Sequence, residues 1–145
     1  MSVKKGRLGK KIIRRSGFED KVEANLKERG IKYIYEDKNH KLGYTKLSCP
    51  HCGESVSRGT YTCDYFIERR SGVRLLCELK GYLDSAGRTK YALIKRDNPK
   101  EDIRFLFQRN NPIRRGSKTT YGMWAEKLGF PWAVGNEIPQ SWIDE

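Results

Sequence analysis

The sequence contains no apolar run that approaches the ~20 residues needed to cross a bilayer, so we expect no membrane partner. Its basic N-terminus lacks the apolar stretch of a secretory signal. Cysteine and histidine are scarce, at four and two residues, which excludes a dense disulfide framework. We therefore expect the protein to stay in a reducing cytoplasm, with its cysteines as thiols or metal ligands.

Acidic residues are also in short supply. The 145 residues include 30 Lys and Arg against 18 Asp and Glu, a formal net charge of +12. An excess of this size is typical of proteins that bind a polyanion such as nucleic acid, although a merely soluble cationic protein is the alternative. Three Trp, eight Tyr and five Phe exclude a disordered tail, and the length suits one domain.

The first fifteen residues form a segment with basic residues and no acid. Such a block repels itself, so we expect a flexible arm over residues 1–15 that contacts a phosphate backbone; a solvated tail is the alternative. Its basic side chains are Lys4, Lys5, Arg7, Lys10, Lys11, Arg14 and Arg15.

Hydrophobic periodicity predicts a single α/β domain over residues 16–145. Helices are expected over residues 16–29 and 88–97, and from a cap at Thr119 or Thr120 to Leu128. Strands are expected at residues 31–35, 41–47, 60–68, 73–80 and 103–108. The short join between the third and fourth strands predicts an antiparallel hairpin, and the helix before the last strand suggests a βαβ crossover.

The hairpin strands carry two acids and an amine. A tight turn around residues 70–72 places Asp64 opposite Glu78, and strand alternation puts Glu78 and Lys80 on one face. Carboxylate oxygens are the ligands that Mg²⁺ prefers, and this ion takes one or two of them plus substrate phosphate. Asp64 and Glu78 are therefore candidate metal ligands, with the Leu79 carbonyl beside them. Lys80 would orient or activate the attacking water; a Glu–Lys pair on a solvated strand face is the alternative.

These residues carry a resemblance. The pattern from Asp64 to Glu78-Leu79-Lys80 resembles the PD-(D/E)xK nuclease signature, with Cys63 in place of the usual proline. Five blocks in order resemble bacteriophage endonuclease I, the Holliday-junction resolvases of T-seven-like phages. The blocks are RSGFEDKV at 15–22, YTCDYF at 61–66, ELKG at 78–81, GSKTTYG at 116–122 and IPQSWI at 138–143.

The resemblance implies a PD-(D/E)xK nuclease-like core, a mixed central sheet flanked by helices, and a domain-swapped homodimer acting on branched DNA in the host cell cytoplasm. Residues 16–47 would be exchanged with the partner, and residues 48–59 would be a loop insertion. Glu19 would be the swapped carboxylate that completes the set of Asp64, Glu78 and Lys80, with two Mg²⁺ per site and Mn²⁺ as a substitute. Ser16 and Glu19 also have the spacing of a capping box, a competing role.

A basic loop precedes the last predicted helix. Its cations are Arg109, Arg114, Arg115 and Lys118. We expect them to contact the DNA backbone, with the N-terminal amides of the helix gripping a phosphate. Ordinary surface charge is the alternative.

The sequence Cys49-Pro-His-Cys52-Gly resembles half of a zinc knuckle. A structural zinc site needs four ligands, so the pair needs two more. The candidates are His40, His51, Cys63, Cys77 or a second pair from the other subunit; an unmetallated turn is equally open. Strand alternation predicts that Cys63 and Cys77 face away from the acidic cluster and are buried.

Two other functions compete with a Mg²⁺-dependent junction endonuclease. A restriction-type nuclease would share the same core and cut a linear duplex. A zinc-ribbon nucleic-acid-binding protein, built around Cys49 and Cys52, would have no catalytic activity.

Overall fold

The computed structural model describes residues 17–145, so the expected arm and the Ser16 cap lie outside the described residues. Five strands form one sheet in the order β1-β4-β5-β6-β7, and two more form a separate ribbon, β2-β3. The elements are α1 (Gly17–Glu28), β1 (Tyr33–Tyr35), β2 (Leu42–Ser48), β3 (Ser55–Tyr61), β4 (Tyr65–Glu68), β5 (Arg74–Lys80), α2 (Ser85–Asp97), β6 (Ile103–Phe107), α3 (Tyr121–Leu128), β7 (Trp132–Val134) and α4 (Gln140–Asp144).

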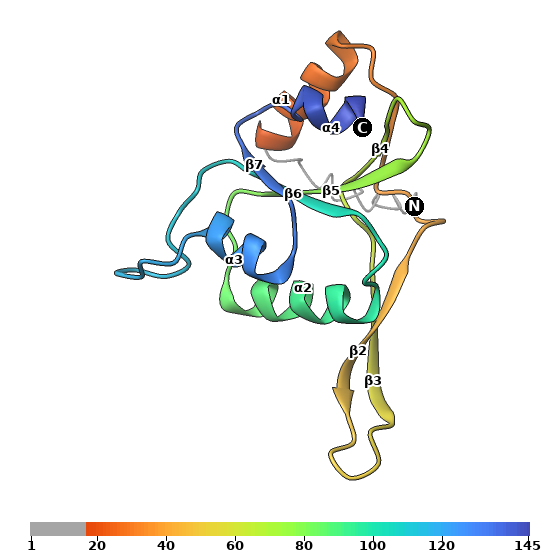
Figure 1. Cartoon of the computed structure of the whole chain (residues 1–145), viewed down its shortest axis with the longest axis vertical. Helices are drawn as coiled ribbons and strands as arrows, with labels where there is room; N and C mark the ends of the chain where they lie inside the picture. The colour runs from red at the N-terminus through yellow and green to blue at the C-terminus, as the bar shows by residue number, and fades with distance from the viewer. Residues whose placement is uncertain (1–16) are drawn as a thin grey trace, which may run out of the picture.

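The main sheet is mixed and is covered by helices on both faces. Strands β1, β4 and β5 pair antiparallel, whereas β5, β6 and β7 pair parallel. Helices α1 and α4 lie over one face, and α2 and α3 lie over the other (Figure 1). The predicted α/β class with a mixed sheet flanked by helices is confirmed.

Helix α1, which the sequence predicts over residues 16–29, packs on its own chain through an apolar stripe. Phe18, Val22 and Leu26 are buried in one core cluster with Tyr65 and Cys77 of the sheet. The helix ends as expected, because Gly30 adopts the left-handed conformation that glycine tolerates after a helix. The stripe therefore fixes the start of α1 beside the central strands.

The predicted hairpin and crossover are both present. Strands β4 and β5 pair with Tyr65 opposite Cys77 and Phe66 opposite Leu76, the register that places Asp64 beside Glu78. Strand β5 then connects through α2 to a parallel β6, which is the expected crossover. The central strand thus carries its polar residues toward the end where the chain turns into α2.

The expected continuous strand over residues 60–68 is wrong. Strand β3 ends at Tyr61 and β4 begins at Tyr65, and the two belong to different sheets. The intervening residues bond locally: the Cys63 thiol donates to the Tyr65 carbonyl at 3.2 Å, and the Asp64 carboxylate accepts from the Leu79 amide at 2.9 Å. The break leaves β3 to pair with β2, so the segment 48–59 includes most of a strand as well as a loop.

Helix α2, strand β7 and helix α4 also differ from the sequence expectations. Helix α2 begins at Ser85, before the expected residue 88, because the Asp84 carboxylate accepts from the Gly87 amide and caps it. Strand β7 and helix α4 are not among the elements that the sequence predicts. Trp132 in β7 pairs opposite Phe105, which extends the sheet by one strand.

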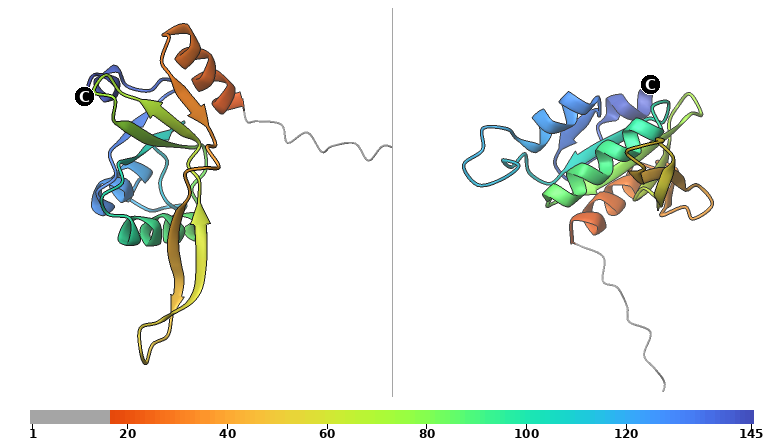
Figure 2. Two further views of the ribbon diagram at one scale, coloured as in Figure 1. Left: turned by 90° about the vertical axis from the view of Figure 1, so that its right-hand side faces the viewer. Right: turned by 90° about the horizontal axis from the view of Figure 1, so that it is seen from below.

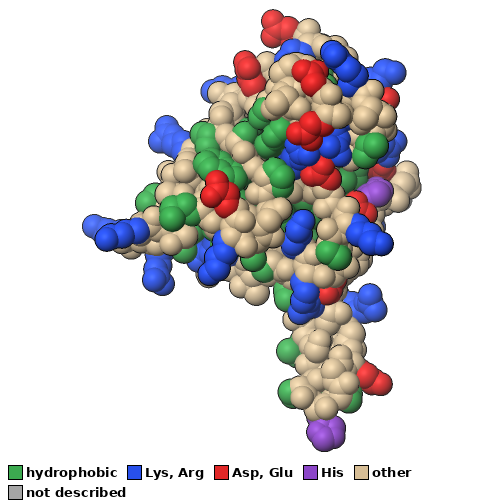
Figure 3. All heavy atoms as spheres, viewed as in Figure 1, with side chains coloured by type: hydrophobic (Ala, Val, Ile, Leu, Met, Phe, Trp, Pro, Cys, Tyr) green, Lys and Arg blue, Asp and Glu red, His purple; other side chains and the backbone are tan. Residues whose placement is uncertain are grey.

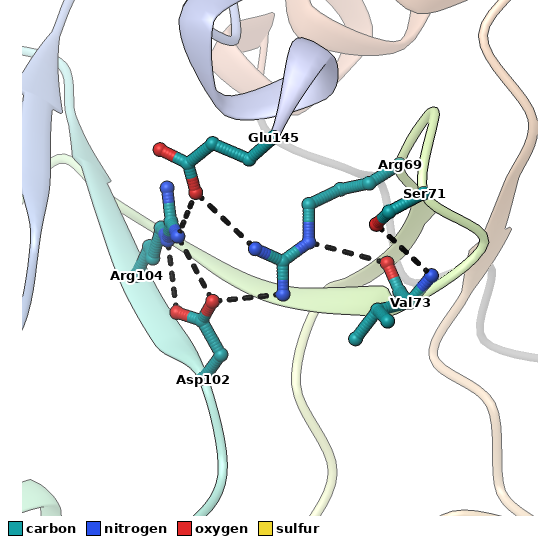
Figure 4. Close-up of polar contacts among 6 residues, drawn as sticks. All are labelled: Arg69, Ser71, Val73, Asp102, Arg104 and Glu145. Carbon is teal, nitrogen blue, oxygen red and sulfur yellow. Dashed lines mark hydrogen bonds and ion pairs between the residues drawn. The ribbon is translucent and has the colours of Figure 1, made fainter.

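The C-terminus is tied to the sheet by a cluster of charges. Arg104 is buried in β6 and bonds both Asp102 and the carboxylate of Glu145 (Figure 4). Arg69 joins the same group through Asp102 at 2.9 Å and Glu145 at 3.2 Å. The cluster holds α4 against the β4–β5 turn and β6.

The β2–β3 ribbon projects away from the body of the protein (Figures 1 and 2). Its base is anchored to the C-terminal end of α2: the Thr45 amide donates to Asp97 at 2.7 Å, and the Asn98 amide group donates to the Gly43 carbonyl at 3.0 Å. Its far end, residues 49–53, is the most distant part of the hairpin from these anchors. Among the described residues, no helix is long and apolar enough to cross a membrane.

Candidate active site

The structure brings together the acids and the amine that the sequence singled out on the hairpin. The Lys80 Nζ atom lies 3.4 Å from the Glu78 Oε1 atom. The Asp64 amide donates to the Glu78 Oε2 atom at 3.3 Å, and the Asp64 carboxylate accepts from the Leu79 amide at 2.9 Å. Asp64, Glu78 and Lys80 therefore form one cluster at the end of β5.

Two tyrosines hold Glu78, and the sequence did not predict this. Glu78 is only 4% exposed. The Tyr61 hydroxyl donates to its Oε2 atom at 2.6 Å, and the Tyr91 hydroxyl donates to its Oε1 atom at 2.7 Å. Tyr61 comes from the end of β3 and Tyr91 from α2, so two other elements fix the carboxylate that β5 carries. An aromatic residue on the apolar stripe of a helix next to an acidic strand was the signal available for Tyr91.

Burial and neighbouring negative charges shift the pKa values in the cluster. Burial and the neighbouring charge of Glu78 raise the pKa of Asp64 to about 7, although the Leu79 amide and Lys80 oppose this. Burial and Glu78 also raise the pKa of Tyr61 and of Tyr91, so both tyrosines stay hydrogen-bond donors at neutral pH. Crowded carboxylates of this kind favour any positive charge placed between them.

Glu19 of the same chain lies close to this cluster. Its backbone carbonyl accepts from the Tyr65 hydroxyl at 3.5 Å, which joins the first turn of α1 to β4. The charge of Glu19 is among the causes that raise the pKa of Asp64. The packing of α1 thus brings the predicted third carboxylate to the edge of the site from within one chain.

The oxygen ligands of the cluster fit a hard divalent cation whose other ligands are water and the substrate phosphate. Within residues 17–145, no three His, Cys, Asp or Glu side chains are grouped so as to hold a metal ion unaided. Mg²⁺ commonly uses one or two protein carboxylates, several waters and substrate phosphate, and the pair of Asp64 and Glu78 matches that demand. The Leu79 amide is already engaged by Asp64, which leaves its carbonyl as the backbone donor beside the pair.

The expectation that Cys63 faces away from the acidic cluster is wrong. Cys63 lies in the same core cluster as Leu76, on the Glu78 side of the sheet, because the chain breaks strand geometry between β3 and β4. Cys77 lies in the core of the opposite face, as expected. Both are buried, and burial raises the pKa of both thiols. Neither can reach Cys49 and Cys52 on the projecting hairpin.

The predicted cations of the basic loop are exposed at the same end of the sheet. The loop between β6 and α3 extends from the body of the protein, and Lys and Arg side chains gather at its end (Figures 1 and 3). Arg114 and Arg115 line a pocket of about 670 Å³ together with Tyr82 and Arg88. Arg109 and Lys118 are exposed on the same loop. Tyr82 follows Lys80 by two residues, so part of the pocket wall comes from the segment directly after the acidic cluster.

The N-terminal amides of α3 are not available for a phosphate in the expected way. The Gly122 amide donates to the Asn110 side chain at 2.9 Å, and the Met123 amide donates to the Thr120 hydroxyl at 3.3 Å. The Tyr121 amide donates to the Asn111 carbonyl at 2.9 Å. The loop therefore caps its own helix, and its guanidinium groups rather than the helix end are the exposed anion-binding groups.

The tip of the β2–β3 hairpin is a compact turn. The Cys49 amide donates to the Glu54 carbonyl at 2.7 Å, and the Gly53 amide donates back to the Cys49 carbonyl at 2.8 Å. The backbone amides of Cys52 and His51 and the Cys52 thiol bond the Cys49 sulfur and lower its pKa. The two sulfur atoms of the motif are therefore neighbours.

Comparison with known proteins gives matches over most of the chain. The sequence matches the family described as Phage endonuclease I over residues 1–145. It is 36% identical to Endonuclease I of Escherichia phage T7 over 132 residues, which cover 90% of this chain and 78% of that relative. It is 35% identical to Endodeoxyribonuclease 1 of Enterobacteria phage T3 over 120 residues, or 82% of this chain and 70% of the relative.

Proposed function

The chain belongs to the phage endonuclease I family and is a nuclease, and we propose that it resolves four-way (Holliday) junctions and other branched DNA by metal-dependent phosphodiester hydrolysis. The observation that supports the chemistry is the cluster of Asp64, Glu78 and Lys80 at the end of β5. The observation that supports the substrate is the exposed basic loop beside it. A site of this kind acts on a polyanion that reaches it along the surface.

The residues of the cluster have separate roles in this proposal. Asp64 and Glu78 hold Mg²⁺, with the Leu79 carbonyl and Glu19 completing a site for two ions, and Mn²⁺ substitutes. When bound, the ions neutralise charge on the scissile phosphate and make water a better nucleophile at neutral pH. Lys80, whose ammonium group lies 3.4 Å from Glu78, orients the attacking water and balances charge that develops on the phosphate.

The DNA-binding surface combines the loop and the N-terminal arm. Arg109, Arg114, Arg115 and Lys118 contact phosphates on one side of the cluster. The arm adds contacts from Lys4, Lys5, Arg7, Lys10, Lys11, Arg14 and Arg15. Backbone contacts carry position and little sequence information, so the enzyme selects the shape of a branch rather than a base sequence.

The functional unit in this proposal is a homodimer. A four-way junction presents two strands to be cut, which two active sites in one dimer would serve. We propose that residues 16–47 are exchanged between subunits, so that Glu19 of one chain completes the site of the other. Exchange recreates the contacts of the closed chain, which here are those of α1 with β4 and β5.

Variants of the cluster test the catalytic proposal. Asp64→Asn, Glu78→Gln and Lys80→Met are each expected to slow cleavage of a synthetic four-way junction in Mg²⁺ by about 10²–10⁴-fold, since each removes a ligand or a charge at the phosphate. Binding of the junction, measured by gel shift in Ca²⁺, should persist within about threefold because the basic surface is intact.

The controls separate this function from its competitors. Lys127→Met, on the exposed side of α3, should cleave at the wild-type rate. Cleavage by Asp64→Asn at that rate would overturn the catalytic assignment. Equal cleavage of a linear duplex of the same sequence would contradict junction selectivity and favour a restriction-type nuclease.

A further inference from the structure

The end of the β2–β3 hairpin has a structure that the proposed nuclease chemistry does not use. Cys49 and Cys52 lie at its tip, on a ribbon that projects away from the sheet (Figures 1 and 2). The turn is closed by two backbone hydrogen bonds between residue 49 and residues 53 and 54. Gly53 makes the turn possible, because its φ of 76° belongs to the left-handed region that favours glycine.

The tip carries two of the four thiolate ligands that a structural zinc site needs. Cys49 and Cys52 are both free cysteines, and they are the first and fourth residues of the turn that the Gly53 amide closes on the Cys49 carbonyl at 2.8 Å. Neighbouring sulfurs with backbone N–H donors suit a soft divalent ion such as Zn²⁺, which prefers four ligands in a tetrahedron. Two ligands are therefore present and two are missing.

The missing ligands do not come from the described part of the same chain. Cys63 and Cys77 are 1% and 0% exposed in the core. The His40 ring packs on Phe66 with ring centroids 5.0 Å apart, at the base of the domain rather than at the hairpin tip. His51 is on the tip but does not group with the two cysteines into a three-ligand set among residues 17–145.

A second observation is that apolar side chains beside the turn are exposed. Leu47 on β2 and Val56 on β3 flank the turn and are 60% and 64% exposed, although both are large apolar residues. A two-stranded ribbon with exposed apolar side chains and unpaired edges favours association with another ribbon. A second copy of the hairpin would cover Leu47 and Val56 and would provide the two missing cysteine ligands.

We propose that two copies of this protein share one Zn²⁺ held by Cys49 and Cys52 of each chain, between β2 and β3. Both cysteines lie outside residues 16–47, so the site forms whether β3 pairs with β2 of its own chain or with β2 of the partner. Leu47 and Val56 of the two ribbons pack together around the ion. The site is structural, because four thiolates leave no open position for substrate. It is separate from the Mg²⁺ cluster, and its existence does not depend on the nuclease assignment.

The metal content of the purified full chain tests the proposal. Mass spectrometry of the metal should find one Zn²⁺ per two chains. Replacement by Co²⁺ should give the intense visible bands of a tetrahedral site with four thiolates. Cys49→Ser and Cys52→Ser should each lower the zinc content at least about tenfold, whereas His51→Ala should keep it.

Further variants and outcomes separate the tip-to-tip site from other zinc sites. Leu47→Lys combined with Val56→Lys should weaken zinc retention against a competing chelator by about tenfold, because the ribbons repel each other. One Zn²⁺ per chain, or loss of zinc in His51→Ala, would overturn the shared site. A chain purified without zinc that also fails to take up Co²⁺ would overturn it entirely. Junction cleavage is measured alongside, so that loss of the metal at the tip and loss of the nuclease are distinguished.

Discussion

At the scale of single residues, the position of Glu78 is the central result. Its carboxylate accepts from Tyr61, Tyr91 and the Asp64 amide and lies beside Lys80. A buried carboxylate that keeps this many partners has little freedom to rotate, so a cation approaching the site meets a fixed ligand. In the proposed mechanism the tyrosines would therefore act through Glu78, as positioning residues.

Removing one tyrosine hydroxyl should weaken both the fold and the metal affinity. Tyr91→Phe leaves a buried Glu78 oxygen without its 2.7 Å donor. We expect the free energy of unfolding to fall by about 1–3 kcal/mol, as for other buried groups that lose a partner. The Mg²⁺ concentration that gives half-maximal cleavage should rise several-fold, because Glu78 is no longer held in one orientation.

Measurements of chemical denaturation and of cleavage against Mg²⁺ concentration check this. Tyr82→Phe is the matched control, since the Tyr82 side chain is 78% exposed, and it should leave stability unchanged. A Tyr91→Phe variant with wild-type Mg²⁺ dependence would show that Tyr91 serves only the core.

The sequence predicted the acids and the amine but not the tyrosines, for a physical reason. Alternation along a strand and the length of a turn are local, so the juxtaposition of Asp64 and Glu78 follows from the chain itself. The contact of Tyr91 depends on how α2 rotates and docks against the sheet, which no local pattern encodes. Cys63 was misplaced because alternation was extended through a segment where the strand is interrupted.

At the scale of elements, the charged cluster at the C-terminus has a clear dependence on pH. Burial raises the pKa of Asp102, but hydrogen bonds and charge from Arg104 and Arg69 outweigh it and leave this pKa below its usual range. Because the folded chain binds fewer protons there than the unfolded chain, the cluster stabilises the fold above the unfolded value of about 4. That stability is lost as the pH falls through the folded pKa.

Asp102→Asn should remove this dependence. At pH 7 we expect the variant to be about 1–2 kcal/mol less stable than the wild type, because buried Arg104 loses a charged partner. The difference should shrink as the pH falls below about 4, because Asp102 of the unfolded wild-type chain takes up a proton there, whereas the folded chain does so only at lower pH. Denaturant titrations between pH 7 and pH 3 check both, with Glu137→Gln, an exposed carboxylate outside the cluster, as the control. A difference that is constant with pH would contradict the assignment.

The sequence predicts the elements best where residues next to each other in the chain, such as a helix cap, determine them. The helix near residues 16–29, the Thr120 cap of α3 and the end of α3 at Leu128 are all present. The division between β3 and β4 was not predicted, because the apolar and aromatic residues from Tyr61 to Ile67 continue across it. The choice of pairing partner decides that division, since β3 pairs back with β2 while β4 pairs with β1 and β5.

At the scale of the whole molecule, the exchange of residues 16–47 is open to a direct test by mixing chains. Glu19→Gln and Asp64→Asn are each expected to be inactive. If Glu19 crosses to the partner, a mixed dimer of the two variants has one site with both changes and one intact site. Equal mixing by refolding makes half of the dimers mixed, so about a quarter of the wild-type sites should be recovered.

Nicking of one strand of a junction measures this recovery. The same variants refolded separately and then combined provide the control, and they should stay inactive while the dimers do not exchange chains. Absence of recovery after joint refolding would contradict the swap and would assign Glu19 to its own chain, as the Tyr65 contact has it here.

The β4–β5 hairpin has one more consequence, for the order in which the chain folds. Asp64 and Glu78 are only 14 residues apart in sequence, and the turn that joins their strands spans just Arg69 to Val73. Hairpins of such low contact order close within microseconds, long before β6 can return through α2. The two like charges therefore meet while water still screens them, and their mutual repulsion grows only as the later elements shut the solvent out.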